Sequence, residues 1–169
     1  MGAMNRYRFC PCCGSPLEEF PIAGALRQTC ADMHCGWVFW DNPIPIVAAI
    51  IQCEDRDGAI LLARNVAWEE GKFALVTGFL ERNEDPAQGV AREVQEETAL
   101  EVLDVALVGL YPFERKNELI LAYHVKARGE IVLNEELAEY RLIAPEKLKA
   151  WEFGTGLAVR DWLSALAVE

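Results

Sequence analysis

The sequence predicts an α/β domain over residues 46–169 that follows a small cysteine-bearing segment over residues 9–36. Three observations support this division. The chain has 169 residues, of which 52% are hydrophobic and 25% charged, a composition typical of folded globular proteins. In the second part, apolar runs of strand length alternate with helical patterns. In the first part, four of the six cysteines lie in two close pairs.

The two cysteine pairs resemble zinc knuckles in their spacing. Residues 10–13 (Cys-Pro-Cys-Cys) leave a two-residue gap between the outer cysteines, and residues 30–35 leave a four-residue gap. Zinc binds four thiolates in a tetrahedron, and a glycine directly after each pair lets the backbone curl around the sulfurs. Either Cys12 or His34 could replace a neighbouring ligand. We therefore expect a zinc ribbon with a structural Zn²⁺ held by Cys10, Cys13, Cys30 and Cys35.

The charge balance excludes some function classes. Sixteen basic residues against 27 acidic residues give a net charge of −11, whereas a protein that clamps duplex DNA needs a broad basic face. The longest uncharged stretch, Asn42–Cys53, is shorter than the roughly 20 residues of a membrane-spanning helix. We expect a cytoplasmic protein without a leader, with neither nucleic acid nor membrane as partner. Residues 1–8 would be a tail that begins with a cloning remnant, Met1–Ala3.

The α/β domain follows a connector over residues 37–45, which two prolines stiffen. Ile46–Cys53 is an uninterrupted apolar run, typical of a strand buried on both faces. A turn at residues 55–58 leads into a second strand, Ala59–Ala63, and a third extended segment spans Phe73–Leu80 with a break at Gly78.

The clearest helix begins at Pro86 and ends near Ala99. Asp85 suits the N-cap, Pro86 the first helical position, and Gln88 a capping box. The later pattern predicts a turn at residues 114–117, strands over 102–110, 119–127 and 140–143, and helices over 134–139, 145–150 and 157–168.

The predicted helix contains Arg92 and three glutamates, Glu93, Glu96 and Glu97. With 3.6 residues per turn, Glu93 and Glu97 lie one turn apart and Glu96 lies beside them. Like charges at these positions repel, so the cluster is either a solvated face or a place for a hard cation. Mg²⁺ prefers oxygen ligands and often bridges to substrate phosphates.

The residues around the cluster favour the cation. Together they read Gly78-x5-Glu84-x7-Arg92-Glu93-Val94-x-Glu96-Glu97-x-Ala99-Leu100. This pattern resembles the Nudix box, G-x5-E-x7-R-E-U-x-E-E-x-G-U with U aliphatic, and departs from it only at Ala99. The resemblance implies an α/β/α sandwich with a mixed sheet. It also implies Mg²⁺- or Mn²⁺-dependent hydrolysis of a nucleoside diphosphate linked to another group.

The resemblance also implies roles for individual residues. Glu93, Glu96 and Glu97 would be metal ligands, with Glu97 the essential one. Arg92 would orient a neighbouring carboxylate. Glu84 would support the metal from the loop, and the Gly78 carbonyl would face it.

The general base and the effect of Ala99 stay open. The base is Glu93 or a glutamate outside the box. In place of the box glycine, Ala99 either adopts a left-handed conformation at a cost of roughly 1 kcal/mol or extends the helix by one residue. The candidates for the base outside the box are Glu135, Glu136 and Glu139.

A chain with zinc knuckles ahead of the box is similar to bacterial NADH pyrophosphatases and to related FAD or ADP-ribose hydrolases. The resemblance implies a dinucleotide, ADP-ribose or nucleotide-sugar substrate and a homodimer. Two alternatives are a catalytically silent nucleotide sensor that recruits a partner and an RNA 5′-end hydrolase. Aromatic residues can stack on a base and basic residues can bind phosphate, so the candidate substrate contacts are Tyr111, Phe113, Tyr123, Arg64 and Arg115.

Overall fold

The computed structural model describes residues 7–167, and the chain divides into two compact units between Asn42 and Pro43. This division falls inside the predicted connector, residues 37–45. The predicted cloning remnant, Met1–Ala3, and Val168, the predicted last residue of the final helix, lie outside the described residues. Within residues 7–167, no helix combines the length and the apolar character that crossing a membrane requires.

The first unit is built on a hairpin of β1 (Leu17–Ile22) and β2 (Ala25–Cys30). Ala23 and Gly24 join the strands with φ values of 50° and 82°, as a two-residue hairpin turn requires. Aromatic residues of the predicted connector pack within this unit. The ring centroid of Phe39 lies 5.2 Å from that of Tyr7 and 6.2 Å from that of Trp37.

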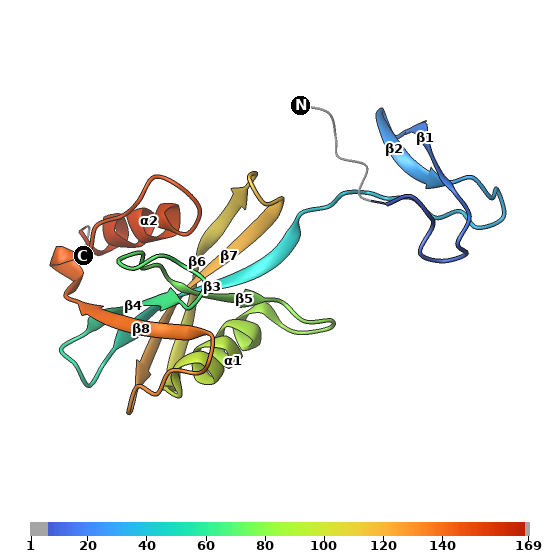
Figure 1. Ribbon diagram of the computed structural model, residues 1–169. Coiled ribbons are helices and arrows are strands. Elements are labelled where there is room, and N and C mark those ends of the chain that lie inside the picture. Colours follow the sequence, from blue (N-terminus) through green and yellow to red (C-terminus); the bar gives the residue numbers. More distant parts are fainter. Residues whose placement is uncertain (1–6, 168–169) are drawn as a thin grey trace. The chain divides into compact units, whose positions relative to one another are not determined.

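The second unit contains a six-stranded mixed sheet (Figure 1). Among the strands of residues 7–167, only β3 and β7 pair in parallel. On its other edge, β3 pairs with β5 through its first half and with β4 through its second half, which sets Gly78 opposite Val47. The strand order is β6 (Glu101–Phe113), β7 (Glu118–Arg128), β3 (Ile44–Cys53), β4 (Ala59–Asn65) and β8 (Leu137–Ile143), with β5 (Val76–Phe79) beside β3.

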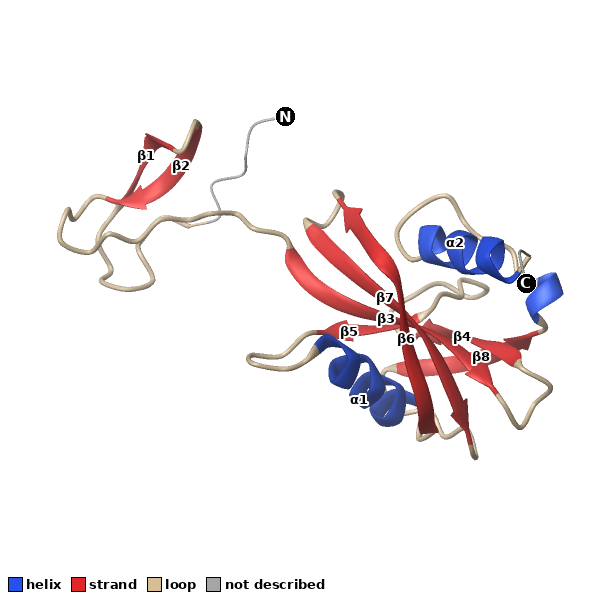
Figure 2. Ribbon diagram, turned by 180° about the vertical axis from the view of Figure 1, so that it is seen from behind, coloured by secondary structure: helices blue, strands red, loops and turns tan. Residues whose placement is uncertain are grey.

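One helix covers each face of this sheet, as Figures 1 and 2 show. Alternate residues of β3 belong to two separate cores, because successive side chains of a strand point to opposite faces. The odd-numbered residues from Val47 to Cys53 pack with α1 (Pro86–Thr98). The even-numbered residues from Ile46 to Ile50 pack with α2 (Gly156–Leu166). The predicted α/β/α sandwich with a mixed sheet is confirmed.

Two helical predictions are wrong. Residues 134–136 form a turn and residues 137–139 belong to β8, and residues 145–150 contain only the short 3₁₀ helix η1 (Pro145–Lys147). In the first case the backbone N–H groups have other partners. Val132 donates to the Thr98 carbonyl at 2.9 Å and Asn134 donates to the Glu97 carbonyl at 3.2 Å. These bonds satisfy the last carbonyls of α1, and the pairing of residues 137–139 with β4 takes the place of a helix.

Both ends of α1 follow from local chemistry. Asp85 is the N-cap, and its carboxylate accepts from the backbone N–H groups of Ala87 and Gln88 at 2.9 Å and 3.2 Å. At the other end, Ala99 adopts the left-handed conformation with φ 58° and ψ 11°. Its N–H still donates to the Gln95 carbonyl at 2.9 Å. Alanine therefore ends the helix in the backbone conformation that favours glycine.

We expect Ala99→Gly to stabilise the protein. A left-handed alanine costs roughly 1–2 kcal/mol, and the greater flexibility of unfolded glycine offsets part of the gain, which leaves about 0.5–1 kcal/mol. Thermal denaturation measures the change as a rise in Tm of a few degrees. Ala91→Gly, inside α1, is the matched control and should lower stability by about 1 kcal/mol. Equal losses for both variants would contradict the assignment of strain to Ala99.

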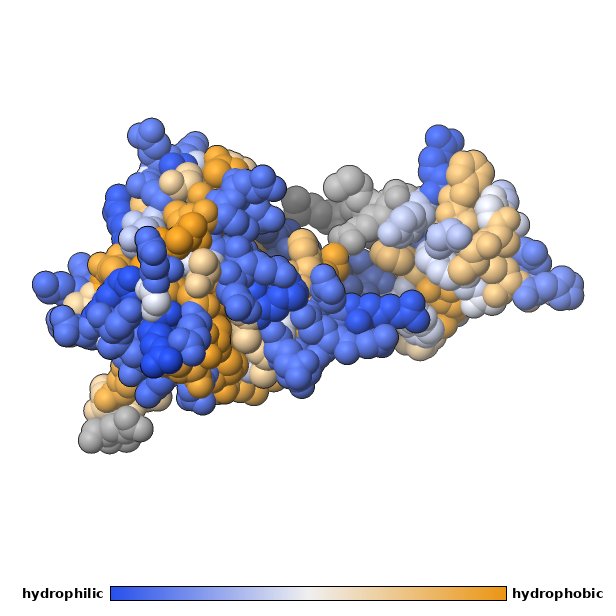
Figure 3. Space-filling model, turned by 90° about the horizontal axis from the view of Figure 1, so that it is seen from below, coloured by the Kyte–Doolittle hydropathy of each residue, from blue (hydrophilic) through white to orange (hydrophobic). Residues whose placement is uncertain are grey.

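Hydrophilic residues cover much of the surface, as the net charge of −11 leads one to expect. On the face seen in Figure 3, hydrophobic residues form separate patches among them. Strand β6, at one edge of the sheet, exposes three leucines by 44–56%: Leu103, Leu107 and Leu110.

Candidate active site

A pocket of about 330 Å³, here called the carboxylate pocket, opens beside Gly78. Among the described residues that line it, five are glutamates and Lys116 is the single cation. Such an excess of negative charge favours the binding of a cation. The lining consists of Ile46, Thr77, Gly78, Phe79, Glu81, Glu93, Glu97, Lys116, Glu118 and Glu136.

Arg92 lies at the centre of an ion-pair network on α1. Its Nε and Nη2 donate to the Glu84 carboxylate at 2.7 Å and 3.1 Å, and its Nη1 donates to Glu93 at 2.8 Å and Glu96 at 3.0 Å. Hydrogen bonds from Arg92, and then from the backbone N–H of Glu81, lower the pKa of Glu84 to about 2. Glu84 thus holds the Arg92 guanidinium in position, and Arg92 in turn orients the carboxylates of Glu93 and Glu96.

Glu97 differs from these residues because it is only 7% exposed. Burial raises the pKa of Glu97 to about 7, and the negative charges of Glu93, Glu136 and Glu96 add to the effect. Burial also raises the pKa of Glu93, although the hydrogen bonds from Arg92 oppose the shift. A bound cation would favour the ionised form of both carboxyl groups.

Gly78 leaves the space that the Glu93 carboxylate fills. A Cβ atom at position 78 would lie 1.8 Å from Cδ of Glu93 and 2.1 Å and 2.3 Å from its two oxygens. Because Gly78 is paired with Val47 in the centre of the sheet, its backbone is held in place. The glycine is therefore required by the close approach of α1 to β5.

The donor set fits a hard divalent cation. Glu93 and Glu97 offer carboxylate oxygens, which Mg²⁺ and Mn²⁺ prefer over nitrogen or sulfur ligands. Mg²⁺ keeps several water ligands and shares others with substrate phosphates, so a few carboxylates are enough to hold it.

The structure distinguishes the candidates for the general base outside the box. Glu136 lines the carboxylate pocket, Glu139 accepts from Arg64 at 2.6 Å, and Glu135 is exposed in the turn before β8. The side chain of Asn134 accepts from the Glu136 N–H at 3.0 Å. The segment that caps α1 thereby also brings Glu136 to the pocket.

Two predicted substrate contacts lie in the cores instead. Tyr111 is buried under α2 and donates to Asp161 at 3.0 Å, and Tyr123 is buried under α1. Their strands, β6 and β7, turn both side chains toward the helices. Neither tyrosine lines the carboxylate pocket.

The other three predicted substrate contacts lie at different places in the structure. Phe113 lines a second pocket, which adjoins the carboxylate pocket. The Arg115 guanidinium lies 6.0 Å from the ring centroid of Phe153 at the same pocket. Arg64 pairs with Glu139 and donates to the Trp68 carbonyl at 3.0 Å, so it lines neither pocket.

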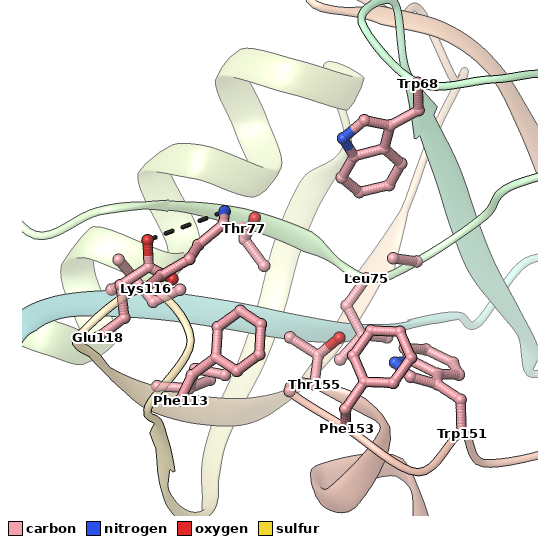
Figure 4. Close-up of a pocket in the computed structure, with 13 residues that line it drawn as sticks. Trp68, Leu75, Thr77, Phe113, Lys116, Glu118, Trp151, Phe153 and Thr155 are labelled. Atoms are coloured by element: carbon pink, nitrogen blue, oxygen red, sulfur yellow. Dashed lines mark ion pairs between the residues drawn. The ribbon is translucent and has the colours of Figure 1, made fainter. Parts of the chain in front are cut away.

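The second pocket, here called the aromatic pocket, has a volume of about 250 Å³ (Figure 4). Trp68, Trp151 and Phe153 line it and are not among the substrate contacts that the sequence predicts. All three are large aromatic residues outside strands and helices, and Phe153 precedes a glycine. Aromatic residues in loops are thus the sequence signal that could have identified them. The lining consists of Ile46, Trp68, Ala74, Leu75, Thr77, Phe113, Lys116, Glu118, Ile120, Trp151, Phe153, Gly154 and Thr155.

In the first unit, four cysteine sulfurs lie within 4.8 Å of one another: Cys10, Cys13, Cys30 and Cys35. Two of the sulfur pairs are 3.4 Å and 3.7 Å apart, close to the ~3.8 Å between ligands of a tetrahedral zinc–thiolate site. Cys12 and His34 are exposed and lie outside this group. The glycines after the two pairs have φ values of 77° and 68°, as the expected turns require.

Comparison with known proteins gives a consistent picture. The family model for the NUDIX domain matches residues 43–161. The chain is 33% identical over 135 residues to the "NAD-capped RNA hydrolase NudC" of Salmonella heidelberg (strain SL476), an alignment that covers 79% of this chain and 50% of that protein. Against the protein of the same name from Mycobacterium bovis (strain BCG / Pasteur 1173P2), identity is 33%, with 73% and 42% covered. The chain spans about half the length of the curated relatives it matches.

Among solved structures, a NUDIX hydrolase from Nitrosomonas europaea is similar with a TM-score of 0.71 and 27% sequence identity. That match covers 84% of this chain and 80% of the other. The MutT protein from Methanosarcina mazei Go1 is similar with a TM-score of 0.58 and 25% identity, and it covers 78% of this chain and 100% of the other.

Proposed function

The chain belongs to the Nudix family, and from this premise we propose that it hydrolyses the diphosphate bond of a nucleotide-linked substrate and releases a nucleoside monophosphate. Candidate substrates are dinucleotides such as NADH or FAD, ADP-ribose and nucleotide sugars. The carboxylate pocket is the observation that supports this proposal most strongly. Five glutamates and one lysine line it, next to a helix whose carboxylates an arginine fixes.

Residues of the pocket and of the adjoining ion-pair network have distinct roles in this proposal. Glu93, Glu96 and Glu97 would hold Mg²⁺ or Mn²⁺, with the Gly78 carbonyl facing it and Glu84 supporting the set through Arg92. When bound, such an ion neutralises the diphosphate and lowers the pKa of a coordinated water. Arg92 keeps the carboxylates oriented without reorganisation during the reaction.

The general base in this proposal is Glu136. It lies in the pocket close enough to Glu97 to raise the pKa of that residue, and a hydrogen bond to Asn134 fixes its backbone. We expect Glu136→Gln to lower kcat by about 10²–10⁴-fold, the range for loss of general base catalysis, with little change in KM. Steady-state kinetics measure both. Glu135→Gln is the matched control one residue away, and equal effects of the two variants would refute the assignment.

A substrate panel tests the proposal itself. The protein would be incubated with NADH, NAD⁺, FAD, ADP-ribose, diadenosine polyphosphates and nucleotide sugars in the presence of Mg²⁺ or Mn²⁺. We expect chromatography to show a nucleoside monophosphate among the products, which identifies the broken bond. Folded protein that binds these nucleotides and cleaves none of them would support the nucleotide sensor instead.

A second candidate is hydrolysis at a capped RNA 5′ end. The observation that favours it is the similarity to relatives named NAD-capped RNA hydrolase. The net charge of −11 offers little electrostatic attraction to a polyphosphate chain. Adding RNA that begins with NAD to the panel separates the candidates, because an RNA hydrolase would prefer this substrate over free NAD⁺.

We also propose that the four clustered cysteines hold a structural Zn²⁺, which makes the first unit a zinc ribbon. Metal analysis should find about one zinc per chain that Mg²⁺ does not replace, because thiolates prefer Zn²⁺. Cys13→Ser should lower this content, whereas Cys12→Ser should not. Loss in both variants would contradict the ligand set.

A homodimer is the assembly we propose, which the family resemblance implies. The exposed leucines of β6, Leu103, Leu107 and Leu110, offer an apolar surface for it at the edge of the sheet. Light scattering would then give twice the mass of one chain.

A further inference from the structure

The carboxylate pocket and the aromatic pocket adjoin each other. They share Ile46, Thr77, Lys116 and Glu118 as a common wall. Figure 4 shows Thr77, Lys116 and Glu118 at one end of the aromatic pocket and Phe153 and Trp151 at the other. A ligand whose charged group lies among the glutamates would therefore direct its next group past this wall into the aromatic pocket.

The aromatic pocket exposes ring surface that a folded protein ordinarily buries. Trp68 is 41% exposed and Phe153 is 56% exposed, although both line a concave site. Its volume of about 250 Å³ is below the roughly 300–1,000 Å³ of sites for drug-sized ligands. It is therefore suited to one ring system rather than to a whole dinucleotide.

The segment that contributes Trp151 and Phe153 is held in a tight conformation. Gly154 adopts a left-handed φ of 54°. A Cβ atom on Gly156 would lie 2.0 Å from the Trp151 carbonyl oxygen and 2.5 Å from its ring. The two aromatic side chains are thus presented by a backbone that tolerates little displacement, which reduces the entropy lost when a ring stacks on them.

Lys116 lies where the two pockets meet. Its Nζ is 3.8 Å from the Glu118 carboxylate, a long ion pair, and the side chain of Lys116 is 66% exposed. Such a side chain can turn toward an anion with little loss of stability, because exposed ion pairs contribute little to the free energy of folding. An ammonium group between an acidic pocket and an aromatic one suits a phosphate that is attached to a ring-bearing group.

We infer that the aromatic pocket is the subsite for the nucleobase of one nucleotide half of the substrate, and that Lys116 binds the phosphate of that half. This inference rests on the proposed function and deepens it. The base would stack on Trp68 and Phe153, and the other half of the substrate would lie outside the aromatic pocket. Aromatic stacking tolerates different bases, so the subsite selects for a nucleotide rather than for a particular second half.

Binding of AMP and of ribose 5-phosphate tests the inference, because the two probes differ only in the base. Calorimetric titration in the presence of Mg²⁺ would use the wild type, Trp68→Ala, Phe153→Ala and Lys116→Ala. Trp40→Ala and Phe20→Ala are matched controls, because these residues of the first unit are 47% and 49% exposed. Trp68→Phe should retain most of the affinity for AMP, which separates stacking from damage to the fold.

We expect Trp68→Ala and Phe153→Ala each to weaken AMP binding by about 5- to 150-fold, the range for loss of one stacked base. Neither should change the affinity for ribose 5-phosphate, whereas Lys116→Ala should weaken the binding of both probes. Unchanged AMP affinity in the aromatic variants, equal weakening of both probes by them, or no AMP binding by the wild type would overturn the inference.

The experiments can refute the proposed function and the subsite separately. If AMP binds in this base-dependent way but no member of the substrate panel is cleaved, the subsite stands and the hydrolase proposal falls. If the panel is cleaved while the aromatic variants change neither AMP affinity nor KM, the hydrolase stands and the subsite falls.

Discussion

Glu97→Gln should lower kcat/KM by at least ~10²-fold and leave the metal-free protein at least as stable as the wild type at pH 8. The loss of activity follows because the amide cannot supply the negative charge that a divalent cation requires. The stability follows from the position of Glu97, which is buried among Glu93, Glu96 and Glu136 with its pKa raised to about 7. A neutral side chain of the same shape removes this repulsion.

The pH dependence of this stability has a definite sign. The pKa of Glu97 is raised from 4.5 to about 7, so the folded protein binds more protons than the unfolded chain between these values. Stability of the metal-free wild type should therefore decrease as pH rises from about 4.5 to above 7. Glu97→Gln should remove part of this decrease. The variant and the wild type should thus differ most at pH 8 and converge at acidic pH.

Kinetics and denaturation together test this prediction. Urea titrations of EDTA-treated protein at pH 5 and pH 8 measure the stability, and hydrolysis of the best panel substrate measures the activity. Glu130→Gln, which changes an exposed glutamate outside both pockets, should match the wild type in each assay. An active Glu97→Gln enzyme would remove Glu97 from the metal site. An inactive but strongly destabilised one would show that its role is structural.

Gly78→Ala should lower kcat by at least ~10²-fold, although the substitution adds only one methyl group. That methyl would overlap the Glu93 carboxylate, whose Cδ lies 1.8 Å from the position of the new Cβ. Because the β5 backbone is paired with Val47 in the sheet, the side chain of Glu93 must move instead. A displacement of about 1 Å at a catalytic group can cost 10²-fold in rate. The stability should change little, because a flexible carboxylate gives way more easily than backbone.

A double-mutant cycle measures whether Gly78 acts through Glu93. If it does, the variant with both Gly78→Ala and Glu93→Ala should be no slower than Glu93→Ala alone. If the loss of kcat in the double variant equals the product of the losses in the two single variants, this mechanism is contradicted. Full activity in Gly78→Ala would show that the Glu93 carboxylate has another productive position.

The sequence predicts the elements whose signals are local. The apolar run Ile46–Cys53 indicates a strand buried on both faces, and β3 has this burial because it lies between two helices. Asp85 and Pro86 identify the start of α1 to the residue. In the site, the spacing from Gly78 to Glu97 predicts that Glu93 and Glu97 lie near Gly78, because one strand, a short loop and one helix contain these residues. Glu118 and Glu136, from β7 and the turn before β8, complete the pocket through distant contacts.

Features that depend on distant contacts were not predictable in this way. The helical pattern over residues 134–139 is overridden because residues 137–139 pair with β4 and Asn134 donates to the end of α1. Tyr111 and Tyr123 resemble base-stacking residues in sequence, but sheet register turns them into the cores. The aromatic pocket combines Trp68 with Trp151, from loops more than 80 residues apart in the chain, and no local pattern reveals that contact.

The measurement that tests the central claim most directly is the rate of hydrolysis of the best panel substrate as a function of Mg²⁺ concentration. We expect no turnover after EDTA treatment, saturable recovery as Mg²⁺ is added, and a recovery in Glu97→Gln that stays at least ~10²-fold lower. Turnover that is independent of Mg²⁺ and Mn²⁺, or equal recovery in the wild type and Glu97→Gln, would contradict a metal-dependent diphosphatase at this pocket.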